Sequence, residues 1–392
     1  MTGDRIVAFD NTEIAFRGKS DKDLNRDYWL FRLMNNTFLA KIGPKLTNFA
    51  IGIGLPVLPL IKSTIFKHFC GGETIKECDP VIQELSKNRV GSILDYSVEG
   101  EQEEQGFRKT AEEIIRTIRR AAGDHRIPFA VFKVTGIARF ELLTKLNYGK
   151  QLTMAEEAEF FKLKARVNDI CRTAYQLDVK IMIDAEESWI QNPVDTLALA
   201  MMQQYNREKA IVYNTYQLYR NDKLAVLKAD IQHAGDYNFI LGAKLVRGAY
   251  MEKERSRATE MGYQSPIHQT KEASDSDYRE ALEFCIQHIK NVAFMAGTHN
   301  EGSCRLLVDL LVTNRIPPNH PHVYFAQLLG MGDNLSFNLA NAGFNVAKYV
   351  PYGPVKVVLP YLFRRAEENS SIAGHTGREL QMIVKEKKRR KY

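Results

Sequence analysis

Two adjacent arginines, Arg364 and Arg365, form the densest chemical signal in the sequence. Tyr361 lies three residues before Arg364, and Glu368 lies three residues after Arg365, so all four fall on or beside one face of a helix. Each guanidinium is a planar fork that binds a carboxylate or a phosphate through two hydrogen bonds, and Glu368 can orient one of them. We therefore predict an anion-binding site, although the same pair on an ordinary surface helix would be solvated.

Polar residues also follow short apolar segments that are typical of buried strands. They are Lys133; Asp184 with Ala185, Glu186 and Glu187; Gln217; Lys244 and Arg247 with Gly248, Ala249 and Tyr250; Thr298 with His299 and Asn300; Gln327; and Tyr349 with Tyr352. In a parallel barrel the carboxyl ends of all strands meet at one face, where active sites gather. Polar residues at seven strand ends therefore predict a site.

Each of these signals also has a purely structural interpretation. Lys133 and Asp184 could form a buried ion pair, and the two glutamates after Asp184 could cap the next helix. His299 could be a hydrogen-bonded core histidine, and Gly248 could serve a simple turn. The prediction of a site therefore depends on the set as a whole.

The elements that must position these residues alternate regularly along the chain. The strand candidates are 91–96, 129–135, 180–184, 210–215, 243–247, 292–296, 322–327 and 345–350. The helical patterns are 110–122, 155–175, 193–205, 223–233, 277–289, 301–313, 335–340 and 355–369. Eight such units over about 280 residues fit the roughly 250 residues typical of a (βα)8 barrel. We predict an α/β fold, a (βα)8 TIM-type barrel over 91–370, with a helical N-terminal arm over 1–90.

The two ends of the chain differ from the barrel. The N-terminal arm contains helical patterns at 24–38 and 78–87, joined by an apolar stretch at 49–61 that is too short to span a bilayer. The C-terminal tail, 371–392, includes six basic residues and one acid between Lys385 and Lys391, which anionic lipid would attract unless the tail is merely solvated. The first residues fit neither a signal peptide nor a transit peptide, so we expect a cytoplasmic protein, with peripheral attachment to the inner face of a membrane as a further expectation.

Composition narrows the classes of function. Of 392 residues, 44% are hydrophobic and 26% charged, which excludes a disordered or fibrous chain. The formal charge of +7 suits an anionic substrate, a phosphate-bearing cofactor or an acidic lipid, and only weakly a nucleic acid, so we expect no nucleic-acid partner. Five scattered cysteines favour neither disulfides nor a zinc site. The sequence lacks both GxGxxG after a strand and GxxxxGK[ST], so a nucleotide cofactor would bind at the barrel mouth.

Six segments together carry a resemblance to a known family. They are DAEE from Asp184, KLVRGAY from Lys244, GTHN from Gly297, QLLGMGD from Gln327, YVPYGP from Tyr349 and YLFRRAEEN from Tyr361. In this order, over about 91–370, the chain resembles proline dehydrogenase. The resemblance implies a distorted (βα)8 barrel with noncovalent FAD. It further implies oxidation of L-proline to Δ1-pyrroline-5-carboxylate, with hydride transfer from ring C5 to flavin N5 and a membrane quinone as acceptor.

The resemblance also implies roles for individual residues. Arg364 and Arg365 would bind the proline carboxylate with help from Lys133, and Asp184 would pair with Lys133 near the flavin. The ring would be walled by Tyr361, Tyr250, Tyr349 and Leu245. The cofactor would be contacted by Asp184, Ala185, Gln217, Lys244, Val246, Gly248, Ala249, Lys271, Thr298, His299, Asn300 and Glu368. Glu99 resembles the acid that closes the site by pairing with the second arginine, although Glu101 is nearby.

One departure from the family concerns Lys244. Bacterial bifunctional relatives have arginine there, near flavin N5, so the lysine resembles the monofunctional branch. A lysine cannot reproduce a guanidinium fork, so we expect a different flavin potential or reactivity. The sequence also lacks the aldehyde dehydrogenase part and the DNA-binding arm of the bifunctional enzymes, so a separate pyrroline-5-carboxylate dehydrogenase would oxidise the product.

Three alternatives remain open. Hydroxyproline dehydrogenase is similar but has serine where Tyr349 stands, so the tyrosine favours proline. Asp184, Glu186, Glu187 and His299 could instead form the divalent-metal site of a barrel hydrolase or aldolase. A basic barrel could also serve as a membrane or nucleic-acid scaffold with no enzymatic activity.

Overall fold

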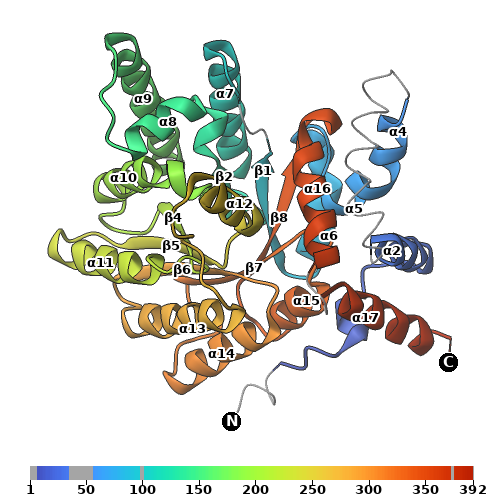
Figure 1. Ribbon diagram of the computed structural model, residues 1–392. Helices are drawn as coiled ribbons and strands as arrows, with labels where there is room; N and C mark the ends of the chain where they lie inside the picture. The colour runs from blue at the N-terminus through green and yellow to red at the C-terminus, as the bar shows by residue number, and fades with distance from the viewer. Residues whose placement is uncertain (1–6, 35–55, 98–100, 372–374, 392) are drawn as a thin grey trace.

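The computed structural model describes residues 7–34, 56–97, 101–371 and 375–391. Its centre is a closed barrel in which eight parallel strands are hydrogen-bonded in chain order, and β1 pairs with β8 (Figure 1). The strands are β1 (Val90–Tyr96), β2 (Phe129–Phe132), β3 (Lys180–Ile183), β4 (Val212–Gln217), β5 (Leu241–Val246), β6 (Val292–Gly297), β7 (Val323–Leu328) and β8 (Val346–Tyr352). All eight predicted strands are confirmed, and the (βα)8 barrel with them.

Alternation along each strand divides the core into two layers. Val131 and Met182 belong to a cluster that fills the barrel interior, whereas Phe132 and Ile183 belong to the larger cluster between strands and helices. Side chains of successive strand residues point to opposite faces, so every second residue enters the barrel. The strand ends therefore divide their polar residues between the mouth and the outer layer.

The outer helices follow the strands in order around the barrel (Figure 1). They are α7 (Glu104–Ala121), α9 (Met154–Gln176), α10 (Ser188–Tyr205), α11 (Lys223–Asp236), α13 (Lys271–Gln287), α14 (Glu301–Thr313), α15 (Asp333–Asn341) and α16 (Val355–Ser371). Two helices between the strands were not predicted: α8 (Phe140–Asn147) and α12 (Met251–Met261). Most residues of α12 are charged, so the sequence shows no clear helical spacing of apolar residues there.

The described part of the N-terminal arm is helical, as predicted. It comprises α1 (Thr12–Ala15), α2 (Asp21–Met34), α4 (Leu58–Ile61), a π-helical turn (Lys62–Phe66), α5 (Lys67–Phe69), a 3-10 turn (Lys76–Cys78) and α6 (Asp79–Lys87). Phe66 and Phe69 pack in one apolar cluster with Val358 and Leu362 of α16. Most of the predicted apolar stretch 49–61 lies outside the described residues.

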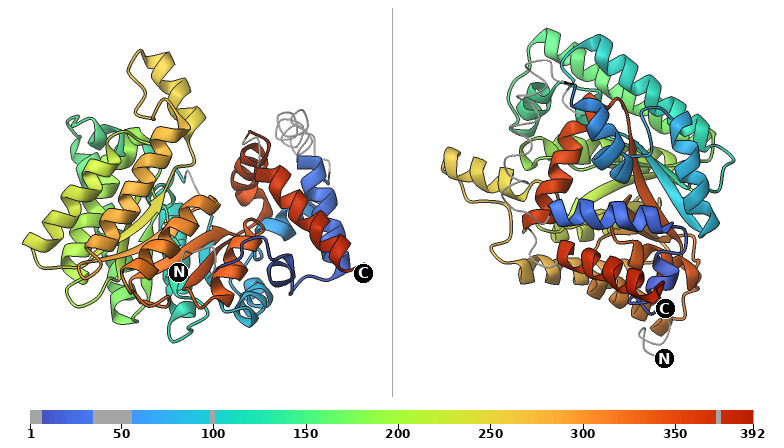
Figure 2. Two further views of the ribbon diagram at one scale, coloured as in Figure 1. Left: turned by 90° about the horizontal axis from the view of Figure 1, so that it is seen from below. Right: turned by 90° about the vertical axis from the view of Figure 1, so that its right-hand side faces the viewer.

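The basic C-terminal segment differs from a solvated tail. It forms α17 (His375–Arg389), which lies beside α2 (Figure 2, right) and buries Met382 and Ile383 against the arm. Arg390 donates to Asp21 at 2.9 Å and to the carbonyl of Phe16 at 2.8 Å. Apolar residues recur with helical spacing within the basic segment, which allows this packing. Acidic side chains of the arm pair with much of its positive charge. In the described part of the chain, no helix is both long enough and apolar enough to cross a bilayer.

Candidate active site

Strand register brings polar residues to one level inside the barrel. Phe132 pairs with Ile183, so Lys133 stands opposite Asp184, and the amide of Asp184 donates to the carbonyl of Phe132 at 2.9 Å. One strand further along, Thr215 pairs with Lys244. Paired residues of parallel strands point to the same face. The strands β2, β3 and β5 therefore send Lys133, Asp184 and Lys244 into the mouth.

These three side chains meet Tyr349 of β8, and we call the four residues the floor cluster. Lys244 Nζ donates to Asp184 Oδ1 and, at 2.8 Å, to the hydroxyl of Tyr349. Lys133 Nζ lies 3.3 Å from Asp184 Oδ2 and 3.7 Å from Asp95 Oδ2 at the end of β1. Asp95 was missed in the sequence, although its place at a strand end is the same signal that identified the others. A carboxylate held between two ammonium groups thus forms the floor of the mouth.

Burial and charge act in opposite directions on the floor cluster. Burial alone would raise the pKa of Asp184, but Lys244 and Lys133 outweigh it, and the pKa lies below its usual range. Burial lowers the pKa of Lys244, and Asp184 opposes this shift. The pKa of Tyr349 is raised well above its usual value by burial and by the nearby carboxylates. At neutral pH Asp184 is therefore ionised and Tyr349 keeps its proton.

The arginine pair lies on α16, which follows β8. Arg365 is 6% exposed, and its guanidinium lies 5.2 Å from the ring centre of Tyr361. Arg364 lies 5.9 Å from the ring of Tyr250, which immediately precedes α12 and follows β5. The predicted aromatic and cationic residues thus meet across the mouth. The side chain of Glu368 and all of Glu99 lie outside what the structure describes.

The opposite side of the mouth, formed by β4 to β6, holds the residues expected at the cofactor. Gln217 Nε2 donates to the carbonyl of Glu186 at 2.9 Å, while its buried Oε1 has no hydrogen-bond partner. Arg247 donates to Thr298 Oγ1 and Ser303 Oγ at 3.0 Å each. Arg247 was noticed in the sequence but was not assigned to the cofactor. A guanidinium and two hydroxyls beside the start of α14 form a polar cradle suited to an anion.

The remaining residues of that prediction lie around this cradle. Lys271, at the start of α13, is exposed and pairs with Asp275, which also accepts from Arg247. His299 Nε2 accepts from the amide of Leu328 at 3.3 Å, and Asn300 caps α14 through Ser303. Capping of the helix therefore accounts for an asparagine at position 300 without a ligand. Ala185 and Val246 are half-buried at the strand ends, and Ala249 is exposed.

Packing changes the prediction for Leu245 and gives Gly248 a structural role as well. Leu245 does not face the mouth, because it alternates with Lys244 and Val246 and packs in the outer layer. The inward leucine is Leu328, which pairs with Tyr349 and packs against both the interior cluster and the cluster that contains Tyr361. Gly248 has φ +146°, and a Cβ there would lie 2.4 Å from the ring of Tyr219. The glycine is therefore required by the close approach of an aromatic ring.

The geometry gives no support to the metal-site alternative. Glu186 accepts from the amide and hydroxyl of Thr135, and Glu187 pairs with Lys253 of α12. Asp184 is already held between lysines. Among the residues that the structure describes, no three His, Cys, Asp or Glu side chains are grouped so that they could hold a metal ion.

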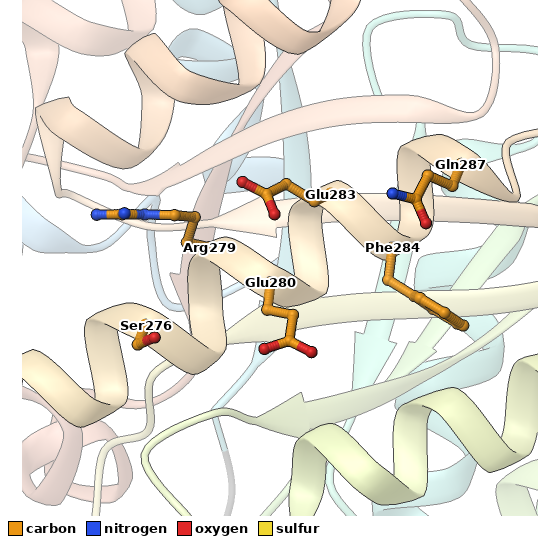
Figure 3. A pocket seen from close by; sticks show the side chains of 6 residues that line it. All are labelled: Ser276, Arg279, Glu280, Glu283, Phe284 and Gln287. Carbon is orange, nitrogen blue, oxygen red and sulfur yellow. The ribbon is translucent and has the colours of Figure 1, made fainter.

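Among the residues that the structure describes, hollows outside the floor cluster include the following two. One lies on the outer surface of α13, where Glu280 and Phe284 leave the same side of the helix (Figure 3). Lys228 of α11 contacts both of these residues. Its lining consists of Ser276, Arg279, Glu280, Glu283, Phe284 and Gln287, none of which is at a strand end. A smaller one lies beside His299 and Gly332, where α17 supplies Arg378 and Glu379. Helix α17 therefore reaches the rim of the mouth.

A closed (βα)8 barrel with a buried carboxylate, paired lysines and an arginine pair at its mouth is the architecture of a barrel enzyme for a small anionic substrate. The family model described as proline dehydrogenase matches residues 78–378, and the chain belongs to this family.

Named relatives agree with this assignment. Mitochondrial proline dehydrogenase 1 of Dictyostelium discoideum is 34% identical over 428 residues, covering 97% of this chain and 74% of the relative. The Drosophila melanogaster protein of the same name is 40% identical over 250 residues, covering 61% of this chain and 37% of the relative. The chain thus spans about two fifths of the length of some relatives.

Proline utilization A from Bdellovibrio bacteriovorus superposes with a TM-score of 0.73 at 18% identity, covering 92% of this chain and 38% of that chain. At this identity the match supports the fold alone.

Proposed function

We propose that this chain oxidises L-proline to Δ1-pyrroline-5-carboxylate with noncovalently bound FAD. The observation that carries the proposal is the arrangement of the floor cluster with the arginine pair at a single mouth. Proline has a carboxylate next to a ring nitrogen. Its carboxylate suits the two guanidinium groups, which lie at the same mouth as the ionised floor cluster. Membership of the proline dehydrogenase family supports the same substrate.

The residues present fit a flavin. Gln217 Oε1 is a buried acceptor without a partner in the mouth, and a flavin ring offers an N–H donor. Arg247, Thr298 and Ser303 form the polar cradle beside the start of α14, where phosphates are favoured. Thr298 and His299 line the same region. When bound, FAD accepts a hydride from ring carbon C5 of proline and passes the two electrons on to a quinone.

The cations of the mouth bind and orient the substrate. Arg364 and Arg365 hold the carboxylate in a bidentate manner, and Lys133 contributes a third charge. The proline ring packs against the side chains of Tyr361, Tyr250 and Tyr349. Leu328 takes the place first expected for Leu245. Fixing the carboxylate sets the position of C5, which supplies the orientation that the reaction needs.

Charge in the mouth also selects the protonation state of the substrate. Cationic side chains around the ring nitrogen disfavour the ammonium form, so proline reacts as the neutral amine. The nitrogen lone pair then forms the C=N bond as the hydride leaves C5, and the nitrogen proton is afterwards lost to water. Asp184 remains ionised and holds Lys133 and Lys244 in place throughout.

Tyr349 restricts the ring of the substrate. Its hydroxyl is held by Lys244 at 2.8 Å, and its ring lies next to Leu328 along the β7–β8 ladder. Tyr349 is 8% exposed. In the proposed site its ring occupies the space that a hydroxyl on the substrate ring would need. We therefore favour proline over 4-hydroxyproline as the substrate.

Delivery of electrons to a quinone requires contact with a membrane. We assign this contact to the face that includes α2, α4 and α17 (Figure 2, right). Trp29, Leu33 and Leu60 are 58%, 57% and 66% exposed there, and Lys388 and Lys391 of the C-terminal segment are also exposed. Exposed apolar side chains beside lysines suit peripheral binding to anionic lipid.

A visible absorption spectrum of the purified protein tests the proposed function. We expect a yellow protein whose chromophore is released by denaturation and is bleached by L-proline in the native state. A colourless, correctly folded protein that remains inactive after FAD is added would overturn the proposal.

A further inference from the structure

The N-terminal arm is hydrogen-bonded to the elements that carry the substrate residues. The amide of Gly71 donates to the carbonyl of Pro351 at 2.8 Å, and the amide of Gly353 donates to the carbonyl of Gly72 at 3.1 Å. Glu73 Oε1 accepts from the amide of Val355, the first residue of α16, at 3.1 Å. The arm thus extends the backbone hydrogen bonding at the end of β8. It also fixes the start of α16, the helix that carries the arginine pair.

One buried residue of the arm, His68 in α5, reaches the loop between β7 and α15. His68 Nε2 lies 2.9 Å from the carbonyl oxygen of Gly330, and Nδ1 lies 3.1 Å from Asp27 Oδ1. A carbonyl and an ionised carboxylate can only accept hydrogen bonds, so both ring nitrogens must donate, which requires the imidazolium form. Gly330 has φ +78°, and a Cβ there would lie 2.7 Å from the imidazole ring. Ring and loop therefore fit closely.

Asp27 links His68 to further charged residues. Asp27 also accepts from Lys19 at 2.7 Å, and Arg26 lies 3.2 Å from it. Lys19 also forms an ion pair with Asp333 at 2.8 Å, and Asp333 pairs with Lys348 of β8 at the same distance. We call Lys19, Asp27, His68, Asp333 and Lys348 the arm network.

The loop held by the arm network borders the substrate site. Lys348 Nζ donates to the carbonyl of Met331 at 2.6 Å and to that of Leu328 at 3.2 Å. Leu328 pairs with Tyr349. Met331 packs in the cluster that contains Tyr361. A displacement of this loop would therefore move apolar contacts on two sides of the mouth.

We propose that His68 is a positioning residue for the substrate site: as an imidazolium it joins Asp27 of the arm to the carbonyl of Gly330 and so fixes the loop 328–331 beside Tyr349 and Tyr361. The inference rests on the proposed oxidation of proline. It assigns a functional role to the N-terminal arm, which lies outside the barrel.

Two isosteric substitutions separate the two hydrogen bonds of His68. In His68→Gln the amide nitrogen occupies the position of Nε2 and can still donate to Gly330. In His68→Asn it occupies the position of Nδ1 and can donate only to Asp27. Each holoenzyme is assayed for proline KM and for kcat per bound flavin, with flavin content measured by absorbance. We expect His68→Asn to raise KM about tenfold with kcat changed less than threefold, since a charge-assisted hydrogen bond is worth roughly a factor of ten. We expect His68→Gln to recover most of this loss.

His322 provides a matched control. Its Nδ1 lies 2.8 Å from the carbonyl of Ile289 at the opposite end of the barrel, so His322→Gln removes a similar bond without touching the mouth. We expect that variant to lose stability at unchanged KM. Equal KM values for both His68 variants, or a wild-type KM in His68→Asn with only a lower melting temperature, would overturn the inference. Failure of the wild-type protein to oxidise proline would instead overturn the proposed function.

Discussion

The floor cluster and the arm network are built from the same chemistry but differ in what surrounds them. Each holds an aspartate between two cations: Asp184 between Lys133 and Lys244, and Asp27 between Lys19 and His68. In the arm network, the other N–H groups of His68 and Lys348 donate to backbone carbonyls. The floor cluster instead faces a mouth that is lined by further charged side chains. Closed networks stabilise structure, and those left open at one side can receive a ligand. The two should therefore respond differently to the same kind of substitution.

Asp184→Asn should produce the largest effect on activity. It leaves Lys133 and the buried Lys244 without their shared counter-charge, a change worth about 3–5 kcal/mol, so we expect kcat/KM for proline to fall by about 10²- to 10⁴-fold. The matched control is Asp195→Asn, because Asp195 pairs with the buried Lys223 behind the strands at 2.5 Å. Steady-state kinetics per bound flavin should show an unchanged kcat/KM in the control. A similar loss in both variants would mean that the floor cluster acts only through stability.

Asp27→Asn should act mainly on stability. Burial alone would raise the pKa of Asp27, but Lys19 and His68 outweigh it and lower the pKa far below its usual range. A lowered pKa contributes stability that is present above about pH 4, the unfolded value, and is lost as the pH falls below it. We expect the free energy of unfolding to drop by about 3 kcal/mol at pH 7, with the difference from wild type shrinking below pH 4. Denaturant titrations at pH 7, 5 and 3.5 measure this, and a difference that does not depend on pH would contradict the assignment.

Tyr349→Ser should change specificity more than turnover. Removing the ring makes room for a hydroxyl, so the ratio of kcat/KM for 4-hydroxyproline over proline should rise about tenfold. Tyr349→Phe is the control, because it removes the hydrogen bond to Lys244 and keeps the ring. If the ratio is unmoved in Tyr349→Ser, or rises equally in Tyr349→Phe, Tyr349 does not limit the space for the substrate.

The smallest effect should come from the surface lysines. Lys388 is exposed on α17, and replacing it with alanine removes roughly 1 kcal/mol of attraction to anionic lipid, about a fivefold loss of vesicle affinity. Lys385 pairs with Asp10 at 3.3 Å, so Lys385→Ala should lose less. Cosedimentation with anionic and neutral vesicles at low salt compares the two. Equal binding by wild type and Lys388→Ala would remove α17 from the proposed membrane face.

The barrel and most of the floor cluster could be predicted because their signals are local. Apolar segments of regular spacing specify strands, and polar residues at their ends specify the mouth. Leu245 was misplaced although a signal existed, since it alternates with Lys244 and must face outward. Register, by contrast, follows from barrel closure, so no local pattern shows that Lys133 stands opposite Asp184.

The arm network could not be predicted for a different reason. Lys19 and Asp333 are more than three hundred positions apart, and neither has a local motif that indicates its partner. His68 follows an apolar stretch and reads as an ordinary core residue. Only packing of the arm against α15 and β8 brings these charges together, and such packing depends on the whole fold.

The pairing of α17 with α1 and α2 also affects when the protein becomes active during its synthesis. Ribosomes add about 5–20 residues per second, so roughly 20 to 80 seconds separate the synthesis of α1 from that of α17. During this interval α1 and α2 lack the buried contacts of Met382 and Ile383, and β1 waits for β8 before the barrel can close. Long-range contacts of this kind form late because distant segments must first meet. Because the arm borders the mouth, assembly of the substrate site is delayed until α17 has left the ribosome and can pack against the arm.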